Sequence, residues 1–310
     1  MGSAFELRGE KILVTGASGF LGTHLCRRLC ESGARVHAVS RAQRYSKGES
    51  LQWWQGDLGD INTARKLLAA IKPGLVFHLS SHGKGAPSLD LVLPTLHSDL
   101  ISTVNLLTAA AELGLGRMVL TGSLEEPEPD NREVSPSSPY AAAKWAGTAY
   151  ARMFHQLYRL PVVIVRPFMT YGPGQPQEKL IPYVILSLLR GQAPKLTSGQ
   201  RRIDWIYVDD VIDGFLAAAQ VPGVEGCTMD LGSGTLVPIR EVVTCLVDLV
   251  HGEVEPLYGA LPERPVDHVR VAKTADTYVR LGWKPTTSLG KGLRETVGWY
   301  DRHLKDYSAL

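Results

Sequence analysis

The sequence predicts an α/β protein in which a doubly wound parallel sheet is joined to a second, smaller α/β domain. Two observations predict this class. Short apolar runs alternate with amphipathic stretches as far as Pro167, and a glycine-rich turn joins the first run to the first stretch. Such alternation of strands and helices is typical of a parallel sheet that carries helices on both faces.

The expected elements follow one another in a regular order. The apolar runs KILVTG and RVHAVS have the character of buried strands, and the amphipathic stretch between them ends at Gly33, a residue typical of helix ends. The same rhythm continues along the chain. We predict strands at 11–16, 35–40, 75–81, 117–123 and 161–167, and helices at 21–33, 98–114 and 140–158.

The character of the sequence changes after Pro167, where proline and glycine crowd the stretch RPFMTYGPGQPQ. The later stretch WIYVDDVIDGFLAAA has the pattern of a strand followed by a helix, and we predict that it returns to the main sheet. The larger domain is therefore expected to contain 8–168 and about 205–234, and the smaller domain 169–204 and about 235–310.

Charge and hydropathy exclude several classes of partner. With 33 basic and 31 acidic side chains, the chain has little net attraction for nucleic acid or for an anionic membrane. Apolar runs such as PVVIV are too short to cross a bilayer, and the N-terminus lacks the basic region and apolar core of a signal peptide. We therefore expect a cytoplasmic protein with no nucleic-acid or membrane partner.

The cysteines indicate neither a disulfide framework nor a metal site. They lie at positions 26, 30, 227 and 245, without a CxxC pair and without a histidine at metal-ligand spacing. Cys26 and Cys30 fall on the apolar side of a predicted helix, where they suit small hydrophobic side chains. We expect reduced, buried thiols and no bound metal.

The stretch TGASGFLG, residues 15–22, lies where the first strand meets the first helix. Gly16 permits a tight turn, Gly19 lets the backbone approach a pyrophosphate, and Gly22 allows helix and strand to touch. Glycine-rich turns also end many strands for conformational reasons alone, but this position favours a dinucleotide site in a Rossmann domain, with phosphates at the helix N-terminus. We assign to the cofactor Gly16, Ser18, Gly19, Phe20, Leu21 and Gly22.

The end of the second strand indicates which dinucleotide binds. A carboxylate usually holds the adenosine ribose there, but this strand ends in Ser40 and Arg41, followed by Arg44. A hydroxyl and a guanidinium can bind a 2′-phosphate, so we infer NADP(H); the alternative is a solvated basic face. Asp57 and Leu58 are expected to contact the adenine, although Asp57 is equally suited to a turn or helix cap.

Tyr140 and Lys144 are expected on one face of a helix, because they lie four residues apart in the stretch YAAAK. A phenol needs a nearby positive charge to release its proton near neutral pH, and Lys144 can supply that charge. Ser123 follows a strand whose carboxyl end belongs to the ligand-binding edge of the sheet. We predict that Ser123, Tyr140 and Lys144 form a proton-transfer set beside a nicotinamide.

These motifs together resemble the extended short-chain dehydrogenase/reductase family, nucleotide-sugar branch, over nearly the full length. TGASGFLG, VFHLSS, TGS, YAAAK, RPFMTYGPG, DWIYVDD and LGWKPTTSLGKGLRETVGWY occur in the order and spacing of that family. The resemblance implies an NAD(P) cofactor on the larger domain and a nucleoside-diphosphate sugar on the smaller one. It also implies a homodimer through a four-helix bundle that includes the YxxxK helix.

The family contains 4-epimerases, 4,6-dehydratases and 4-ketoreductases, and three features separate them. Dehydratases place an acidic pair after the Ser/Thr position, whereas this chain has Leu124 followed by Glu125; SLEE is more similar to the SSEE of 4-keto-6-deoxysugar reductases. The inferred NADP preference suits an enzyme that consumes a reductant. Met169 replaces the asparagine that the family places before the tyrosine of its RPxNxYGPG motif, which loosens the expected hold on the sugar.

We therefore predict NADPH-dependent reduction of the C4 ketone of a dTDP-linked 4-keto-6-deoxyhexose. An NDP-sugar 4-epimerase or 4,6-dehydratase and a non-catalytic NADP-sensing protein remain alternatives. Arg202 stands one place before the family's arginine position, because Ile203 intervenes. The resemblance implies further cofactor contacts at Leu79, Ser80, Tyr140, Lys144 and Pro167, and substrate contacts at Ser81, His82, Ser123, Glu125, Met169, Tyr171, Leu180, Ile181, Arg202 and Arg264.

Overall fold

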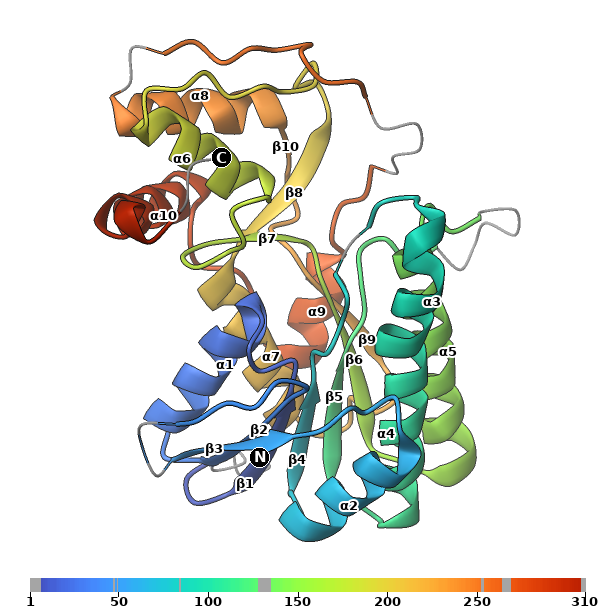
Figure 1. Ribbon diagram of the computed structural model, residues 1–310. Coiled ribbons are helices and arrows are strands. Elements are labelled where there is room, and N and C mark those ends of the chain that lie inside the picture. Colours follow the sequence, from blue (N-terminus) through green and yellow to red (C-terminus); the bar gives the residue numbers. More distant parts are fainter. Residues whose placement is uncertain are drawn as a thin grey trace. The chain divides into compact units, whose positions relative to one another are not determined.

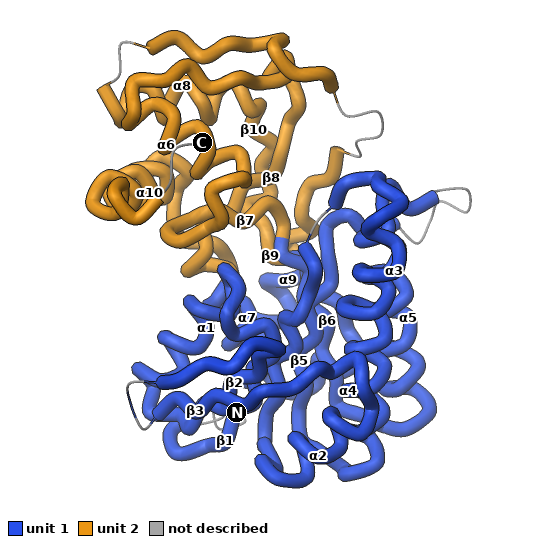
Figure 2. Tube along the Cα trace, viewed as in Figure 1, with its two compact units in different colours: residues 1–167, 212–230, 276–283 blue, residues 168–211, 231–275, 284–310 orange. Residues whose placement is uncertain are grey.

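The structure, a computed structural model, describes residues 7–46, 48, 50–83, 85–127, 135–251, 254–263 and 269–307. The chain divides into two compact units, which Figure 2 shows in different colours. Unit 1 comprises Met1–Pro167, Ile212–Asp230 and Asp276–Trp283, and unit 2 comprises Phe168–Val211, Leu231–Ala275 and Lys284–Leu310.

Unit 1 is built on a seven-stranded sheet with the order β3-β2-β1-β4-β5-β6-β9. Neighbouring strands from β3 to β6 run parallel. The order reverses between β1 and β4, so the predicted doubly wound Rossmann sheet is confirmed and its switch point lies there. The strands are β1 (Lys11–Thr15), β2 (Arg35–Ser40), β3 (Leu51–Gln55), β4 (Leu75–His78), β5 (Arg117–Thr121), β6 (Val162–Pro167) and β9 (Thr228–Leu231).

Helices cover both faces of this sheet. The helices are α1 (Phe20–Glu31), α2 (Ile61–Ile71), α3 (Val92–Thr95), α4 (Ser102–Glu112), α5 (Pro139–Tyr158), α7 (Val208–Gln220) and α9 (Thr274–Leu281), with the 3-10 turn η1 (Leu89–Leu91) and the π-helical turn η2 (Leu96–Ile101). In Figure 1, α1 and α7 lie on one side of the sheet, and α2, α4 and α5 lie on the other. Leu68, Leu106 and Phe154 of the second group pack into one core with Val162 and Ile164 of β6.

The strand at 202–207 departs from the prediction for WIYVDDVIDGFLAAA. This strand, β8 (Arg202–Tyr207), lies in a separate three-stranded sheet of unit 2, and the seventh strand of the main sheet is β9. The assignment of the strand to the main sheet was therefore wrong. The apolar pattern identifies a strand but not its partners, and β8 pairs with β7 (Met169–Tyr171) and β10 (Leu236–Pro238).

Unit 2 consists of this small sheet, in the order β10-β8-β7, and of helices packed on one another. The helices are α6 (Leu180–Leu189), α8 (Ile239–Val250) and α10 (Leu289–Arg302), followed by the 3-10 turn η3 (Leu304–Asp306). Buried Asp204 of β8 accepts hydrogen bonds from the amides of Ser233, Gly234 and Ala272 at 2.6, 3.0 and 2.9 Å. One carboxylate therefore fixes two loops of unit 2.

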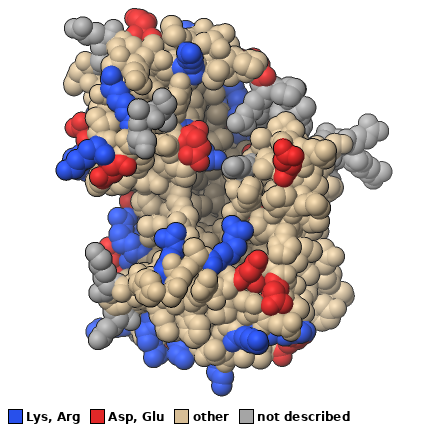
Figure 3. Space-filling model, in the orientation of Figure 1, with Lys and Arg blue, Asp and Glu red and all other residues tan. Residues whose placement is uncertain are grey.

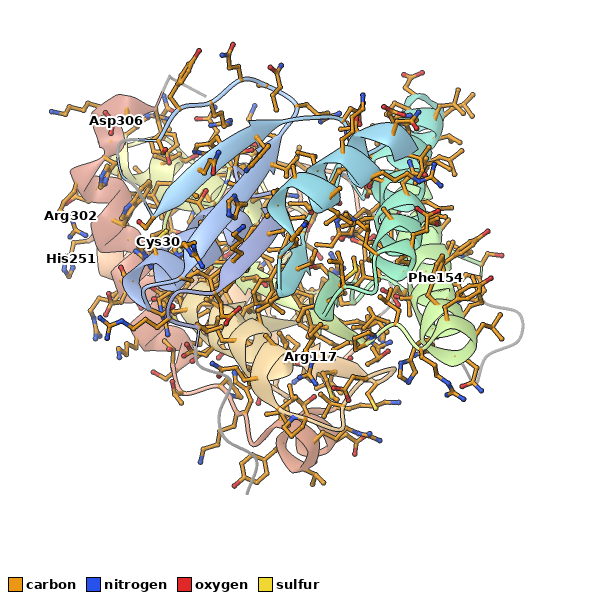
Figure 4. All side chains as sticks on the ribbon, turned by 90° about the horizontal axis from the view of Figure 1, so that it is seen from below. Cys30, Arg117, Phe154, His251, Arg302 and Asp306 are labelled. Atoms are coloured by element: carbon orange, nitrogen blue, oxygen red, sulfur yellow. The ribbon has the colours of Figure 1, made fainter. Side chains whose placement is uncertain are left out.

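Arg117, at the start of β5, binds the C-terminal end of α7. Its guanidinium donates to the carbonyl oxygens of Ala218 and Ala219 at 3.3 and 3.2 Å and pairs with Glu225. Figure 4 shows Arg117 beside this helix. A cation at the C-terminal end of a helix satisfies its last carbonyl groups and complements its dipole.

Neither the surface charge nor the cysteines show an unusual arrangement in the described residues. On the face that Figure 3 shows, basic and acidic side chains are intermixed over each unit. Among the described residues, no helix combines the length and apolar character needed to span a membrane.

All four cysteines are free. Cys26 is buried, whereas Cys30, Cys227 and Cys245 are only partly buried, so the expectation of buried thiols was correct for Cys26 alone.

Candidate functional site

The glycine turn has the geometry that close approach of backbone to backbone requires. Gly16 has a φ of +65°, and a Cβ there would lie 2.6 Å from the carbonyl carbon of Leu79. A Cβ on Gly22 would lie 2.7 Å from the Cα of Ala17. These two glycines therefore let β1, β4 and α1 converge at the switch point.

The N-terminus of α1 leaves room for an anion. Its N-cap, Gly19, carries no side chain to satisfy the first amides, and the first turn contains no acidic residue. Free amides and the positive end of the helix dipole then face whatever binds in the turn. The residues present fit the pyrophosphate of a dinucleotide.

A cleft of about 340 Å³ opens at the carboxyl ends of the strands around this turn. It is lined by nine residues that the sequence analysis assigned to the cofactor: Gly16, Ser18, Gly19, Ser40, Arg41, Asp57, Leu58, Leu79 and Ser80. Ser81, expected at the substrate, also lines it. Phe20, Leu21, Gly22, Arg44, Tyr140, Lys144 and Pro167 are not among the lining residues.

Six lining residues escaped the sequence analysis. These are Thr15, Val39, Ala42, Gly56, Ser98 and Ser102. Ser98 and Ser102 lie four apart in a predicted helix, and this spacing was the one signal that a polar helical face borders the cleft. Nothing in the local pattern showed that Ser98 lies in a π-helical turn and that Ser102 begins the α-helix after it.

The end of β2 shows how the two arginines differ. Ser40 and Arg41 line the cleft, and the carbonyl of Arg41 accepts a hydrogen bond from Gln55 at 3.1 Å. The guanidinium of Arg44 instead lies over the ring of Trp53, 5.5 Å from its centroid. Arg41 is therefore the better placed of the two for a ligand phosphate.

The helix that carries Tyr140 begins as its sequence predicts. Ser138 caps α5 by accepting from the Ala141 amide at 3.1 Å, and Pro139 occupies the first turn, where its missing N–H costs nothing. Tyr140 thus lies at the start of the helix, and Lys144 lies one turn further along.

Ser123, Tyr140 and Lys144 come together at the end of β5. The hydroxyl of Ser123 is hydrogen-bonded to Tyr140, and the Lys144 amino group lies 5.9 Å from the centroid of the Tyr140 ring. The same amino group donates to the carbonyl of Thr121 at 3.0 Å. The three side chains form the geometric set that the sequence analysis expected.

Burial is the main influence on the pKa of the phenol and of the amino group. Burial raises the pKa of Tyr140 above its ordinary value, and the hydrogen bond from Ser123 only partly offsets this effect. Burial also lowers the pKa of Lys144. Burial is therefore the largest influence on the pKa of both groups, and the expected effect of Lys144 on the phenol stays a prediction.

The two glutamates after Ser123 have different surroundings. The carboxylate of Glu126 is buried and accepts from the Ser123 amide at 2.7 Å and from the Thr148 hydroxyl at 3.1 Å; burial raises its pKa. Glu125 is partly buried, and its carboxylate accepts from Ser138 at 3.4 Å. Glu126 therefore holds the backbone of the site, and both glutamates add to the effect of burial that raises the pKa of Tyr140, Glu125 more than Glu126.

A buried histidine connects the cleft to α4. The Nδ1 of His78 lies 2.7 Å from the Thr15 hydroxyl, and its Nε2 lies 2.9 Å from the Thr103 hydroxyl. Thr103 donates its proton to the Asp99 carbonyl at 2.6 Å, so His78 carries its proton on Nε2. Burial lowers the pKa of His78 to about 3, and the ring is neutral.

The expected substrate residues divide between the units. In unit 1, Ser81 and His82 follow β4, and Ser123 and Glu125 follow β5. In unit 2, Tyr171 and Ile181 are almost fully buried, and the Tyr171 hydroxyl bonds the Leu289 carbonyl at 3.2 Å.

The remaining expected substrate residues of unit 2 have varied exposure. Met169 and Leu180 are partly buried, and Arg202 is exposed and bonds the Leu236 carbonyl at 3.2 Å. Arg264 lies outside the described residues. In the part of the chain that is described, no group of three or more His, Cys, Asp or Glu side chains could hold a metal ion.

Comparison with known proteins decides the family. The model of the NAD dependent epimerase/dehydratase family matches residues 12–232. The chain belongs to this family. This confirms the resemblance to extended short-chain dehydrogenases/reductases that the motifs indicated.

Relatives of this family member act on nucleotide sugars. The chain is 31% identical to a UDP-glucose 4-epimerase of Mycolicibacterium smegmatis, over 94% of the chain and 98% of the relative. It is 29% identical to a dTDP-glucose 4,6-dehydratase of Shigella flexneri, over 94% and 92%. Among solved structures, MoeE5 in complex with UDP-glucose and NAD is 30% identical with a TM-score of 0.84, over 95% and 99% of the two chains.

Proposed function

We propose that this protein is an NADPH-dependent 4-ketoreductase, which reduces the C4 ketone of a dTDP-linked 4-keto-6-deoxyhexose. The observation that carries the proposal is the Ser123–Tyr140–Lys144 set, which gathers a proton donor, a hydroxyl and an amino group at the end of β5. A ketone reduction needs a proton donor for the developing alkoxide, and a phenol with a raised pKa keeps its proton near neutral pH.

The cofactor proposal depends on the end of β2. Ser40 and Arg41 line the cleft where a carboxylate would repel a 2′-phosphate, and this supports NADPH over NADH. Bound there, a reduced nicotinamide would supply the hydride for the C4 carbon. MoeE5, by contrast, is described with NAD, so the preference is a property to be measured on this chain.

The three side chains have separate roles in the proposed reaction. Tyr140 gives its proton to the C4 oxygen, and Ser123 donates a hydrogen bond to the same oxygen. Lys144 stabilises the phenolate that remains, since its amino group lies close to the ring. Positioned proton transfer of this kind is worth roughly 10²- to 10⁴-fold in rate.

Two other reactions of the family are the competing proposals. The similarity to a 4-epimerase of Mycolicibacterium smegmatis favours a 4-epimerase, which would work on an unoxidised sugar without added reductant. A 4,6-dehydratase is less well supported, because Leu124 stands where an acid would donate a proton and Glu125 is already bonded to Ser138.

The assembly proposal is a homodimer that uses the face of α3, η2 and α5. These elements pack beside one another in unit 1 (Figure 1). They carry exposed apolar side chains, among them Leu93, Leu96, Trp145 and Tyr150, of which Leu93 is 72% exposed. A second copy that covered this face would bury apolar surface and would complete a four-helix bundle.

The test follows the loss of NADPH absorbance with dTDP-4-keto-6-deoxyglucose, with NADH in parallel. We expect oxidation of NADPH in the wild type and none in Tyr140→Phe, which should still bind NADPH because only one hydroxyl is removed. Tyr150→Phe is the matched control, since Tyr150 is an exposed tyrosine on the same helix. Conversion of UDP-glucose or dTDP-glucose without added reductant, together with no NADPH oxidation, would replace the proposal with an epimerase or dehydratase.

A further inference from the structure

A tight turn after β5 engages the polar atoms of Ser123. The Ser123 carbonyl accepts from the Glu126 amide at 3.2 Å, which closes a β-turn. The Ser123 amide donates to Oε1 of Glu126 at 2.7 Å, and the Ser123 hydroxyl accepts from the Glu125 amide at 3.1 Å. Because the Glu125 amide is a donor, the proton of the Ser123 hydroxyl stays available for the hydrogen bond to Tyr140.

The carboxylate of Glu126 also reaches the helix that carries Tyr140. Glu126 is 3% exposed, and its Oε1 accepts from the Thr148 hydroxyl of α5 at 3.1 Å as well as from the Ser123 amide. Thr148 lies four residues after Lys144 and eight after Tyr140, so these three side chains follow one face of α5. One oxygen atom therefore joins the turn to the helical face of the proton-transfer set.

Gly122 leaves the space that this carboxylate occupies. Its backbone is not left-handed, so conformation alone does not require glycine there. A Cβ on Gly122 would lie 2.5 Å from Oε1 of Glu126 and 2.9 Å from Cγ of Arg166. The Gly122 amide donates to the Val165 carbonyl at 2.8 Å, which keeps the residue beside β6. The missing side chain thus lets the Glu126 carboxylate fold back against the end of β5.

A second contact joins β5 to α5, but it uses a member of the set itself. The Lys144 amino group donates to the Thr121 carbonyl at 3.0 Å. In the proposed reaction the same amino group stabilises the phenolate of Tyr140, so this link involves a reacting group. The bridge through Glu126 binds Ser123 by its backbone amide, and it leaves the Ser123 hydroxyl and the Lys144 amino group free for their chemistry.

We propose that Glu126 is a positioning residue, which fixes the Ser123 hydroxyl relative to Tyr140 by joining the turn to Thr148 of α5. The inference deepens the proposed function and rests on it only where it assigns those two hydroxyls to a reaction. A displacement of about 1 Å in a reacting group can cost roughly a hundredfold in rate, so a fixed spacing between the turn and the helix matters for turnover.

The test observes the Ser123–Tyr140 contact in the full chain without cofactor or sugar. Tyrosine is labelled with carbon-13 at Cζ, whose chemical shift responds to hydrogen bonding at the hydroxyl, and the Tyr140 signal is assigned by its loss in Tyr140→Phe. Thr148→Val removes only the hydroxyl that Glu126 binds. We expect it to move the Tyr140 signal and to speed hydrogen exchange of the Ser123 amide roughly two- to tenfold, the effect of one lost hydrogen bond.

The matched control is Thr108→Val in α4. Thr108 donates to the Val104 carbonyl of its own helix at 2.8 Å, so this substitution removes a hydroxyl of the same kind that does not bind the turn. It should leave both readings as in the wild type. Glu126→Gln keeps an oxygen that can accept from both donors, so it should lie nearer to the wild type than Glu126→Leu, which removes the acceptor.

Turnover gives a second reading, with dTDP-4-keto-6-deoxyglucose as substrate. Thr148→Val should lower kcat roughly tenfold, because the proton donor and the Ser123 hydroxyl are no longer held in register. Neither Glu126 nor Thr148 is among the residues that line the cleft, so NADPH affinity should stay near that of the wild type. A merely structural role would weaken kcat and NADPH affinity together.

An unmoved Tyr140 signal with unchanged Ser123 exchange in Thr148→Val, or equal changes in Thr108→Val, would overturn the inference, and so would an unchanged kcat in an active Thr148→Val enzyme. If Glu126→Leu does not fold, Thr148→Val and Glu126→Gln still decide the outcome. The spectroscopic readings use no substrate, so a protein that reduces no keto sugar but shows the expected changes would lose the proposed function and keep this inference.

Discussion

Replacement of Gly16 by alanine should damage both the fold and the cofactor cleft, and Gly114 provides a matched comparison. Both glycines have left-handed backbone, with φ of +65° and +59°. Left-handed conformation costs a residue with a Cβ roughly 1 to 2 kcal/mol, so both substitutions share that loss. Only the surroundings of the new methyl group differ.

The difference comes from the backbone of 79–80. A Cβ on Gly16 would lie 2.6 and 2.7 Å from the carbonyl carbon and oxygen of Leu79 and 2.7 Å from the Ser80 amide nitrogen, whereas Gly114 has nothing within 4 Å. Backbone atoms cannot rotate away, and overpacking of this kind costs about 1 to 3 kcal/mol more. Gly16→Ala should therefore lose about 2 to 5 kcal/mol in total, against about 1 to 2 kcal/mol for Gly114→Ala.

The assay is urea unfolding followed by circular dichroism, with NADPH binding measured by fluorescence on the same samples. Leu79 and Ser80 line the cleft, so Gly16→Ala should also weaken NADPH binding about tenfold or more, and each tenfold corresponds to about 1.4 kcal/mol. Gly114→Ala should bind NADPH as the wild type does. Equal loss of stability in the two variants, with equal NADPH affinity, would refute the steric argument.

Three further predictions concern charge, pH and assembly. Arg41→Asp should shift the ratio of NADPH to NADH affinity toward NADH by about tenfold or more, because a carboxylate that repels a 2′-phosphate replaces a cation that binds it. Arg44→Ala should change this ratio less, because the Arg44 guanidinium lies on the ring of Trp53. Burial lowers the pKa of His78 to about 3 in the folded protein, so below about pH 6.5 the unfolded chain takes up a proton that the folded one does not. The free energy of unfolding should therefore fall by about 1.4 kcal/mol per pH unit in that range. His78→Asn should lose this slope in urea unfolding, and an unchanged slope would assign it to other groups. Trp145→Asp, on the exposed face of α5, should shift sedimentation from dimer to monomer, whereas a dimer that persists would place the interface elsewhere.

Local patterns were sufficient for the sheet and the glycine turn. The runs that form β1, β4, β5 and β6 are buried over most of their length, so their sequence is mainly apolar and easy to recognise. Gly16 and Gly22 were identifiable because only glycine tolerates the backbone contacts at that junction. The start of α5 is also a local feature, since Ser138 caps the helix and Pro139 occupies its first turn.

The sequence by itself therefore determined the elements, the doubly wound class and the identity of the Ser123, Tyr140 and Lys144 set. Tertiary structure decided which sheet received β8, because a strand pattern does not name its partners. It also decided the burial of Tyr140, which raises the pKa of the phenol. It also brought the Ser81 hydroxyl and the His82 amide to the carboxylate of Asp99, which lies more than fifteen residues away in sequence. Desolvation and long-range contact exist only once the chain has folded, and no local pattern carries them.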